Sequence, residues 1–164
     1  MSSDLVFLTF RLNGTETSFH VHPEEMLIDV LRERANLTGT KLSCDLGACG
    51  ACTVLLDGKP AASCGTFAWQ AADREVRTVE GLADKDGDLD PVQAAFIDNS
   101  AFQCGYCTPG MVVLARALLD ENPDPSRDEI RRWMGANICR CTGYEMIIEA
   151  VQDAAGRLLE AADE

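Results

Sequence analysis

Eight cysteines, arranged in two groups with short internal spacings, constrain this chain more than any other feature of its sequence. An even number of cysteines also occurs in secreted proteins held by disulfide bonds, but 164 residues is long for such a scaffold. The first residues, MSSDLVFLTF, lack the positive charge that opens a signal peptide. We therefore expect an intracellular, cytoplasmic chain whose cysteines bind metal. The cysteines are Cys44, Cys49, Cys52, Cys64, Cys104, Cys107, Cys139 and Cys141.

The first group consists of Cys44, Cys49 and Cys52, with Cys64 further along the chain. Three thiolates this close in sequence converge only if a loop wraps around something small, and the glycines of the segment allow such a loop. The spacing C-x4-C-x2-C with a distant fourth cysteine is the one found in plant-type [2Fe–2S] proteins. Structural zinc sites usually use two short C-x2–4-C pairs instead. The first group therefore predicts an iron–sulfur cluster.

The second group combines Cys104-x2-Cys107 with Cys139-x-Cys141, and its spacing is less specific. Two chelating pairs brought together by helix packing suit zinc as well as iron and sulfide. The C-x-C pair is tighter than zinc sites normally use, which favours an iron–sulfur cluster. A redox-active dithiol at the first pair is a third interpretation, although no thioredoxin-like pattern surrounds it.

The net charge of the chain limits the classes of partner that we expect it to bind. Lysine and arginine number 14 against 27 aspartates and glutamates, which gives a formal net charge of −13. A nucleic-acid or anionic-membrane partner requires a basic face, so neither is expected. No apolar stretch approaches the roughly 20 residues needed to span a bilayer. With 46% hydrophobic residues, the chain has enough apolar side chains for a core.

The first half of the sequence predicts a small sheet packed on one helix. Alternating and β-branched residues indicate strands, and Asn-Gly and Asp-Gly pairs indicate hairpin turns. Pro23 is expected to open the helix. The expected strands cover residues 5–12, 15–21, 53–56, 60–63 and 76–79.

The second half reads as about four helices with cysteines in the loops between them. Residues 83–90 form a polar linker, so we expect two domains, 1–82 and 83–164, in an α+β fold. Helix starts are predicted from Asp-Pro and Thr-Pro pairs and from two capping boxes. These signals are Asp90-Pro91, Thr108-Pro109, Ser126 with Glu129, and Thr142 with Glu145.

Three loops carry a resemblance to a known family. They read CDLGACGACTVLLDG from Cys44, FQCGYCTPGM from Phe102 and NICRCTGY from Asn137. Together they resemble the small iron–sulfur subunits of the molybdenum hydroxylases, the xanthine oxidoreductase and CO dehydrogenase superfamily. The resemblance implies a ferredoxin-like β-grasp domain followed by a four-helix-bundle domain, with one [2Fe–2S] cluster in each.

The same resemblance implies roles for single residues. The first four cysteines match the ligands of a distal cluster on the flavin side. The last four match the ligands of a proximal cluster near a molybdenum cofactor. Gln103 and the sulfur of Cys141 match groups that contact the pterin of that cofactor.

An electron-transfer subunit without catalytic residues of its own is therefore expected. By resemblance, a large subunit holds a molybdenum–pterin dinucleotide cofactor and oxidises the substrate, and a medium subunit holds FAD, in a dimer of heterotrimers. In some relatives, another acceptor replaces the flavin subunit. Two alternatives stay open: a free-standing two-cluster ferredoxin, and a zinc-stabilised interaction module.

Overall fold

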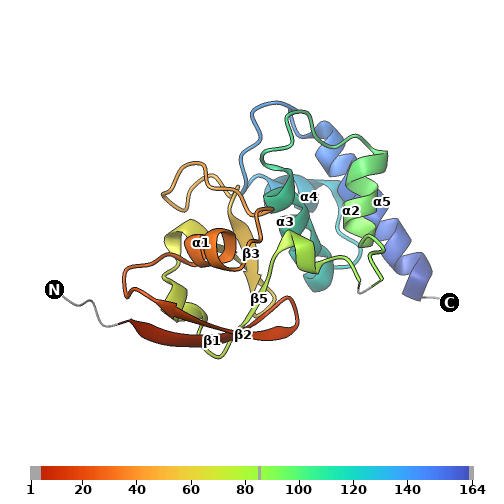
Figure 1. Cartoon of the computed structure of the whole chain (residues 1–164). Helices are drawn as coiled ribbons and strands as arrows, with labels where there is room; N and C mark the ends of the chain where they lie inside the picture. The colour runs from red at the N-terminus through yellow and green to blue at the C-terminus, as the bar shows by residue number, and fades with distance from the viewer. Residues whose placement is uncertain (1–4, 85, 163–164) are drawn as a thin grey trace.

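The computed structural model describes residues 5–84 and 86–162. Its elements are β1 (Val6–Leu12), β2 (Thr15–Val21), α1 (Leu27–Asp29), the π-helical turn η1 (Val30–Arg34), β3 (Thr53–Leu56), β4 (Lys59–Ala62), the 3₁₀ turns η2 (Ser63–Gly65) and η3 (Ala68–Ala71), β5 (Glu75–Arg77), the 3₁₀ turn η4 (Val79–Gly81), α2 (Pro91–Asp98), α3 (Thr108–Glu121), α4 (Arg127–Met134) and α5 (Glu145–Ala162). Figure 1 shows the strands and α1 on one side of the molecule and α2 to α5 on the other.

The sheet has five strands in the order β2-β1-β5-β3-β4. β1 and β5 run parallel, and all other neighbours are antiparallel. Along β1, Leu8, Phe10 and Leu12 are buried while Arg11 is exposed, as the two-residue period of a strand requires. The buried side chains pack against α1 and η1 and form the core of this half. The N-terminal hairpin predicted from the sequence is confirmed.

Several predicted boundaries in this half are wrong by a residue or more, and two of them have a clear structural cause. The helix begins at Leu27 rather than at Pro23, because Met26 is still extended and pairs with Phe67 in an isolated β-bridge. The last strand ends before Thr78, because the backbone N–H of Thr78 donates to Asn13 Oδ1 at 2.9 Å instead of continuing the ladder. Side-chain contacts from distant segments thus override the local pattern at both places.

The four helices that follow the sheet enclose a second hydrophobic core. Met111 on α3 and Ile147 on α5 are fully buried in it, and Leu55 and Leu82 from the first half belong to it too. The predicted α+β class is confirmed. The described residues contain five α-helices, since α1 joins the four of the second half. α3 begins after Cys107 as its cap residue, one position earlier than the Thr-Pro signal indicates.

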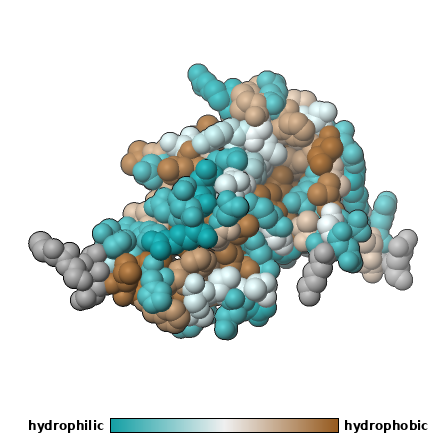
Figure 2. All heavy atoms as spheres, in the orientation of Figure 1, coloured by the Kyte–Doolittle hydropathy of each residue, from teal (hydrophilic) through white to brown (hydrophobic). Residues whose placement is uncertain are grey.

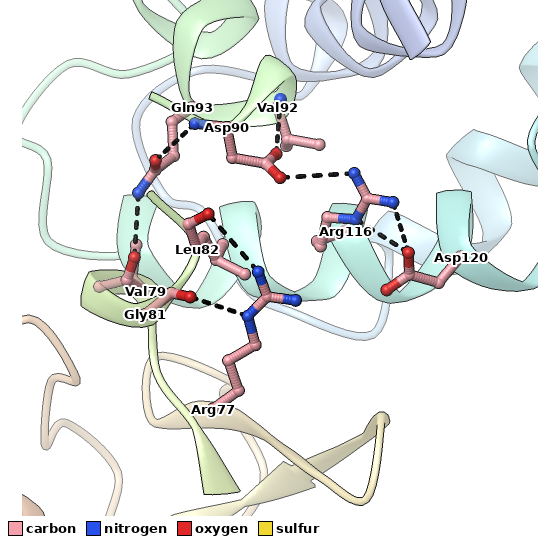
Figure 3. Close-up of polar contacts among 9 residues, drawn as sticks. All are labelled: Arg77, Val79, Gly81, Leu82, Asp90, Val92, Gln93, Arg116 and Asp120. Carbon is pink, nitrogen blue, oxygen red and sulfur yellow. Dashed lines mark hydrogen bonds and ion pairs between the residues drawn. The ribbon is translucent and has the colours of Figure 1, made fainter. Parts of the chain in front are cut away.

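Polar contacts fix both ends of the predicted linker, as Figure 3 shows. The guanidinium of Arg77, on β5, donates to the carbonyl of Gly81 at 2.9 Å. Asp90 caps α2 as predicted, and its carboxylate also lies 3.4 Å from the guanidinium of Arg116 on α3. The side chain of Gln93 donates to a carbonyl of η4. The connection is therefore anchored at both ends.

The surface on the face of Figure 2 carries hydrophobic side chains in several separate patches among hydrophilic ones. Within the described ranges, none of the helices combines the length and apolar content of a bilayer-spanning segment.

Candidate iron–sulfur centres

The first four cysteines are gathered by one loop and one turn. Cys44, Cys49 and Cys52 lie on the segment between η1 and β3, and Cys64 lies in η2, directly after β4. Because β3 and β4 form an antiparallel hairpin, the residues just outside its open end are neighbours. The Sγ atoms of Cys52 and Cys64 are accordingly 3.3 Å apart.

Backbone N–H groups of this loop point at the sulfurs. The Sγ of Cys44 accepts from the N–H groups of Leu46 and Cys49, both at 3.4 Å, and the Sγ of Cys64 accepts from Gly47 at 3.3 Å. Gly47 has a φ of 69°, a left-handed conformation that glycine adopts without strain. The N–H groups, led by that of Leu46, lower the pKa of the Cys44 thiol to about 6. Cys44 is therefore a thiolate at neutral pH, the form that binds metal.

Cys64 has the opposite environment. Burial raises the pKa of its thiol to about 11, and the neighbouring thiol of Cys52 contributes to the increase. A thiol of this kind stays protonated at neutral pH unless a cation lies beside it, and a coordinating metal ion removes its proton. The first set thus contains a preformed thiolate at Cys44 and a buried thiol at Cys64 that ionises when a metal ion binds it.

The last four cysteines come from two loops distant in sequence. Cys104 and Cys107 lie between α2 and α3, and Cys139 and Cys141 lie between α4 and α5. The Sγ atoms of Cys104 and Cys141 are 3.7 Å apart, and the thiols of Cys107 and Cys139 lie close enough for each to shift the pKa of the other. Each close pair therefore takes one cysteine from each loop, so helix packing assembles this set.

The pKa values of Cys107 and Cys139 shift in opposite directions, although burial acts to raise both. It raises the pKa of the Cys107 thiol to about 12, with a further contribution from Cys139. Burial also acts to raise the pKa of Cys139, but hydrogen bonds led by the hydroxyl of Thr142 outweigh it, so the pKa is lowered overall. The Thr142 Oγ1 lies 3.1 Å from the Cys139 Sγ. Within this pair, hydrogen bonds thus favour the thiolate of Cys139, whereas Cys107 keeps its proton more tightly than a free thiol.

The pairing of the thiols fits a two-metal cluster. A tetrahedral metal with metal–sulfur bonds of about 2.3 Å separates its ligand sulfurs by about 3.8 Å. The observed separations of 3.3 and 3.7 Å are close to this value. Throughout residues 5–84 and 86–162, no three Cys, His, Asp or Glu side chains converge as ligands of one metal ion. Thiols that approach in pairs suit a cluster in which each of two irons binds two thiolates, and all eight cysteines are free of disulfide bonds.

A buried hydroxyl next to the second set supports the same fit. Thr108 Oγ1, one residue after Cys107, is buried and has no hydrogen-bond partner within the described part of the chain. An unsatisfied buried hydroxyl is costly, and the sulfurs of a group bound by Cys107 would offer it an acceptor. When bound, a [2Fe–2S] cluster takes up and releases electrons one at a time.

The two sets of thiols adjoin. A cavity of about 200 Å³ is lined by all four cysteines of the second set and by Cys49 of the first. The backbone N–H of Ile138, next to the ligand candidate Cys139, donates to the carbonyl oxygen of Cys49 at 2.8 Å. One hydrogen bond therefore joins the backbones of the two cysteine loops.

The surface near the second set is open. Gln103, Cys104 and Cys141 are all exposed, and so are the apolar side chains of Tyr106 and Ile138. The position of Gln103 beside Cys104 is compatible with contact to a partner, and the pterin-contacting role of Gln103 and Cys141 stays a prediction.

Sequence reasoning missed three residues that shape this site. Asn137, Thr142 and Tyr144 make hydrogen bonds around Cys139. Thr142 and Glu145 were predicted to form a capping box, which is wrong in part: the Thr142 hydroxyl accepts from the N–H of Tyr144 and donates to the Cys139 sulfur. In the sequence, the role of Asn137, Thr142 and Tyr144 is indicated only by their closeness to Cys139 and Cys141.

Two family models match the chain. A model described as "2Fe-2S iron-sulfur cluster binding domain" matches residues 10–83, and one described as "[2Fe-2S] binding domain" matches residues 78–152. The first match contains the first four cysteines, and the second contains the last four. Iron–sulfur binding is therefore supported for both halves independently.

Relatives match along almost the whole chain. The nicotine 6-hydroxylase small subunit of Paenarthrobacter nicotinovorans is 46% identical over 156 residues, which cover 95% of this chain and 93% of that protein. The nicotinate dehydrogenase small FeS subunit of Eubacterium barkeri is 45% identical over 152 residues, covering 93% and 96%.

Solved structures agree. The structure of quinoline 2-oxidoreductase from Pseudomonas putida 86 contains a chain with a TM-score of 0.92 and 46% identity, covering 99% of this chain and 100% of that one. In the aldehyde oxidoreductase from Desulfovibrio desulfuricans, the match has a TM-score of 0.90 and 46% identity and covers 94% of this chain but 17% of that longer one. Two iron–sulfur family models match this chain, and its relatives along nearly the whole length are small subunits of oxidoreductases. The chain therefore belongs to the family of [2Fe–2S] iron–sulfur subunits of the molybdenum hydroxylases.

Proposed function

We propose that this subunit carries electrons from a molybdenum–pterin dinucleotide cofactor in a large subunit to FAD in a medium subunit. The last four cysteines hold the proximal cluster, which receives the electron, and the first four hold the distal cluster, which passes it on. The observation that carries the proposal is the contact between the two cysteine loops, in which the Ile138 N–H donates to the Cys49 carbonyl. Electron transfer between two clusters requires that their sites lie close together.

We assign the direction of transfer with the help of the exposure at the two ends. Cys104 and Cys141 reach the surface next to Gln103, which gives the proximal cluster an open edge for the large subunit. At the other end, Leu46 in the first cysteine loop is 83% exposed, so this loop also reaches the surface. We assign this end to the electron acceptor.

The assembly is proposed from the relatives. The protein from P. nicotinovorans is named a small subunit, and in the aldehyde oxidoreductase the matching segment is 17% of one longer chain. Both arrangements join a segment like this one to a larger catalytic part. A dimer of heterotrimers in the cytoplasm, with a β-grasp domain over 1–82 and a four-helix bundle over 83–164, completes the proposal.

The test replaces Gln103 by alanine in the complex assembled with its co-purifying subunits. An exposed glutamine contributes little to a helical core, so both clusters and the melting temperature should be retained. Loss of one or two hydrogen bonds at an interface costs about 1–3 kcal/mol, which should slow reduction of the clusters by substrate in stopped-flow measurements or lower molybdopterin occupancy.

The matched control is Gln152→Ala, which removes another exposed glutamine, on α5. It should leave the reduction rate unchanged. An unchanged rate and unchanged occupancy in Gln103→Ala would contradict the pterin contact. Purification of the native chain alone, with two clusters and no molybdenum-containing partner, would instead indicate a diffusible ferredoxin.

A further inference from the structure

Asn137 is a buried polar side chain that reaches both cysteine loops. It is 4% exposed and lies two residues before Cys139. Its Nδ2 donates to the carbonyl oxygen of Gly110 at 3.0 Å, in the first turn of α3 and three residues after Cys107. Its Oδ1 lies 3.3 Å from the hydroxyl of Thr53, the residue that follows Cys52. One amide thus contacts the segments that follow a ligand candidate in each set.

The first cysteine loop is shaped around this amide. Gly50 lies between Cys49 and Cys52 and has a φ of 72°. A Cβ atom built there would lie 1.7 Å from Asn137 Oδ1, so only glycine leaves room for the amide. The Thr53 hydroxyl donates to the Gly50 carbonyl at 2.7 Å and holds the loop in this conformation. The first cysteine loop therefore has a shape that fits the Asn137 amide, and it offers the amide a hydroxyl to bind.

The backbone around Asn137 is fixed as well. Its carbonyl oxygen accepts from the hydroxyl of Tyr144 at 2.8 Å, and the same hydroxyl accepts from the N–H of Cys139 at 2.8 Å. The next N–H along the chain, that of Ile138, donates to the Cys49 carbonyl at 2.8 Å. With its side chain and its carbonyl both bound, Asn137 leaves this segment little freedom to move relative to the first loop.

From this geometry we propose that Asn137 is a positioning residue that sets the separation and relative orientation of the two cluster sites, and thereby the rate of electron transfer between them. In that step the proximal cluster loses one electron and the distal cluster gains it, with no bond made or broken. The rate of such a transfer falls steeply with separation, so a small displacement of one loop slows it. The inference rests on the proposed function, in which both sets hold clusters.

The experiment compares Asn137→Ala with Asn99→Ala in the purified holoprotein. Asn99 is a matched control because its Nδ2 also makes two hydrogen bonds, to Ala95 O at 2.9 Å and to Asp153 at 2.7 Å, away from the cysteine loops. Both variants should lower the melting temperature by several degrees. The specific measurement is the magnetic interaction between the two reduced clusters in electron paramagnetic resonance, which depends on their separation and orientation.

Asn137→Ala should retain both clusters and lose part of the splitting caused by this interaction, and electrons should pass between the clusters several-fold more slowly. Asn99→Ala should show the splitting of the unmodified protein. Splitting and transfer rate unchanged in Asn137→Ala would overturn the proposal. Absence of iron and sulfide from the unmodified protein would instead refute the proposed function, and the two failures are thus distinct.

A second variant covers the case in which Asn137→Ala does not load its clusters. Thr53→Val keeps the shape of a buried side chain and removes the hydroxyl that binds Gly50. It should shift the splitting in the same direction by a smaller amount. If Thr53→Val behaves as the unmodified protein while Asn137→Ala loses its clusters, Asn137 serves cluster retention and the positioning role is refuted.

Discussion

The two sets of cysteines differ in how the chain brings them together. The first set needs one loop and one hairpin, and its sulfurs receive backbone N–H groups from that same loop. The second set needs two loops joined by helix packing, and each of its close pairs combines one cysteine from each loop. A local site forms as soon as its loop is ordered, whereas the second forms only when the helical core is packed. We therefore expect the first site to lose its cluster when its loop is disturbed, and the second when the packing of the helices is disturbed.

Removing one ligand from each set gives the largest expected effect. Cys49→Ser should abolish the distal cluster and keep the proximal one, because each ligand set lies within one half of the chain and the substitution preserves the Cys49 carbonyl that Ile138 binds. Cys107→Ser should do the reverse. Iron and sulfide should fall by half in each variant, and electron paramagnetic resonance of the reduced proteins should show one remaining signal. Loss of both signals from either variant would mean that the sites are not independent.

The local site was also the easier one to predict. The alternation of β1 and the Asn13-Gly14 turn identify the hairpin, and the spacing from Cys44 to Cys52 identifies a loop around a small group. These signals are local, so a sequence contains them. The start of α1 was misplaced because a β-bridge to Phe67 keeps Met26 extended, which no local pattern records.

At the second site, the contacts between residues distant in sequence could not be predicted. Spacing identifies Cys104 and Cys107 as a chelating pair, but the structure pairs each with a cysteine of the other loop. The contact between Thr53 and Asn137 spans 84 positions, so neither residue carries a local sign of it. Such contacts depend on how the helices pack, and amphipathic patterns predict that helices pack without specifying which loop ends meet.

Gly50→Ala should break the independence of the two sites. Its Cβ would overlap Asn137 Oδ1, which belongs to the other cysteine loop. The matched control is Gly58→Ala, at a φ of 76° and with no atom within 4 Å of its Cβ. Both variants bear the cost of a left-handed alanine, about 1–2 kcal/mol. Gly50→Ala should lose about 1–3 kcal/mol more, because its neighbours must move.

Cluster retention during mild heating separates the two glycine variants. Gly50→Ala should release both clusters earlier than the unmodified protein, whereas Gly58→Ala should retain both to nearly the same temperature, as followed by visible absorption. If Gly50→Ala released only the distal cluster, the coupling through Asn137 would be disproved and the comparison between independent sites would stand unmodified.

An ion-pair network joins two of the helices that flank the loops of the second set. On α5, Arg157 binds Asp153 at 2.7 Å, and its guanidinium also binds Asp98 at the end of α2 at 2.7 Å. Arg157 is the main reason that the pKa of Asp153 lies below its usual 3.8, with a further hydrogen bond from Asn99. The network therefore ties the end of α2 to α5 and contributes to the packing of the helices, at a distance from the cysteine loops themselves.

The smallest expected effect is that of Asp153→Asn, and its sign depends on pH. A carboxylate whose folded pKa is lowered stabilises the fold above its unfolded pKa of 3.8, and this contribution disappears as the pH falls through the lower folded value. The two side chains are 33% and 34% exposed, so solvent screening limits the contribution to about 1 kcal/mol or less. The urea midpoint of the variant, followed by helical circular dichroism, should lie below that of the unmodified protein at pH 7, and the difference should shrink as the pH falls below 3.8. Asp128→Asn, which removes a carboxylate 83% exposed and paired with Arg131, should produce almost no difference at either pH. A deficit in Asp153→Asn that persists undiminished at pH 3 would show that the side chain acts through packing, and the second site would then depend on its helices without help from this charge.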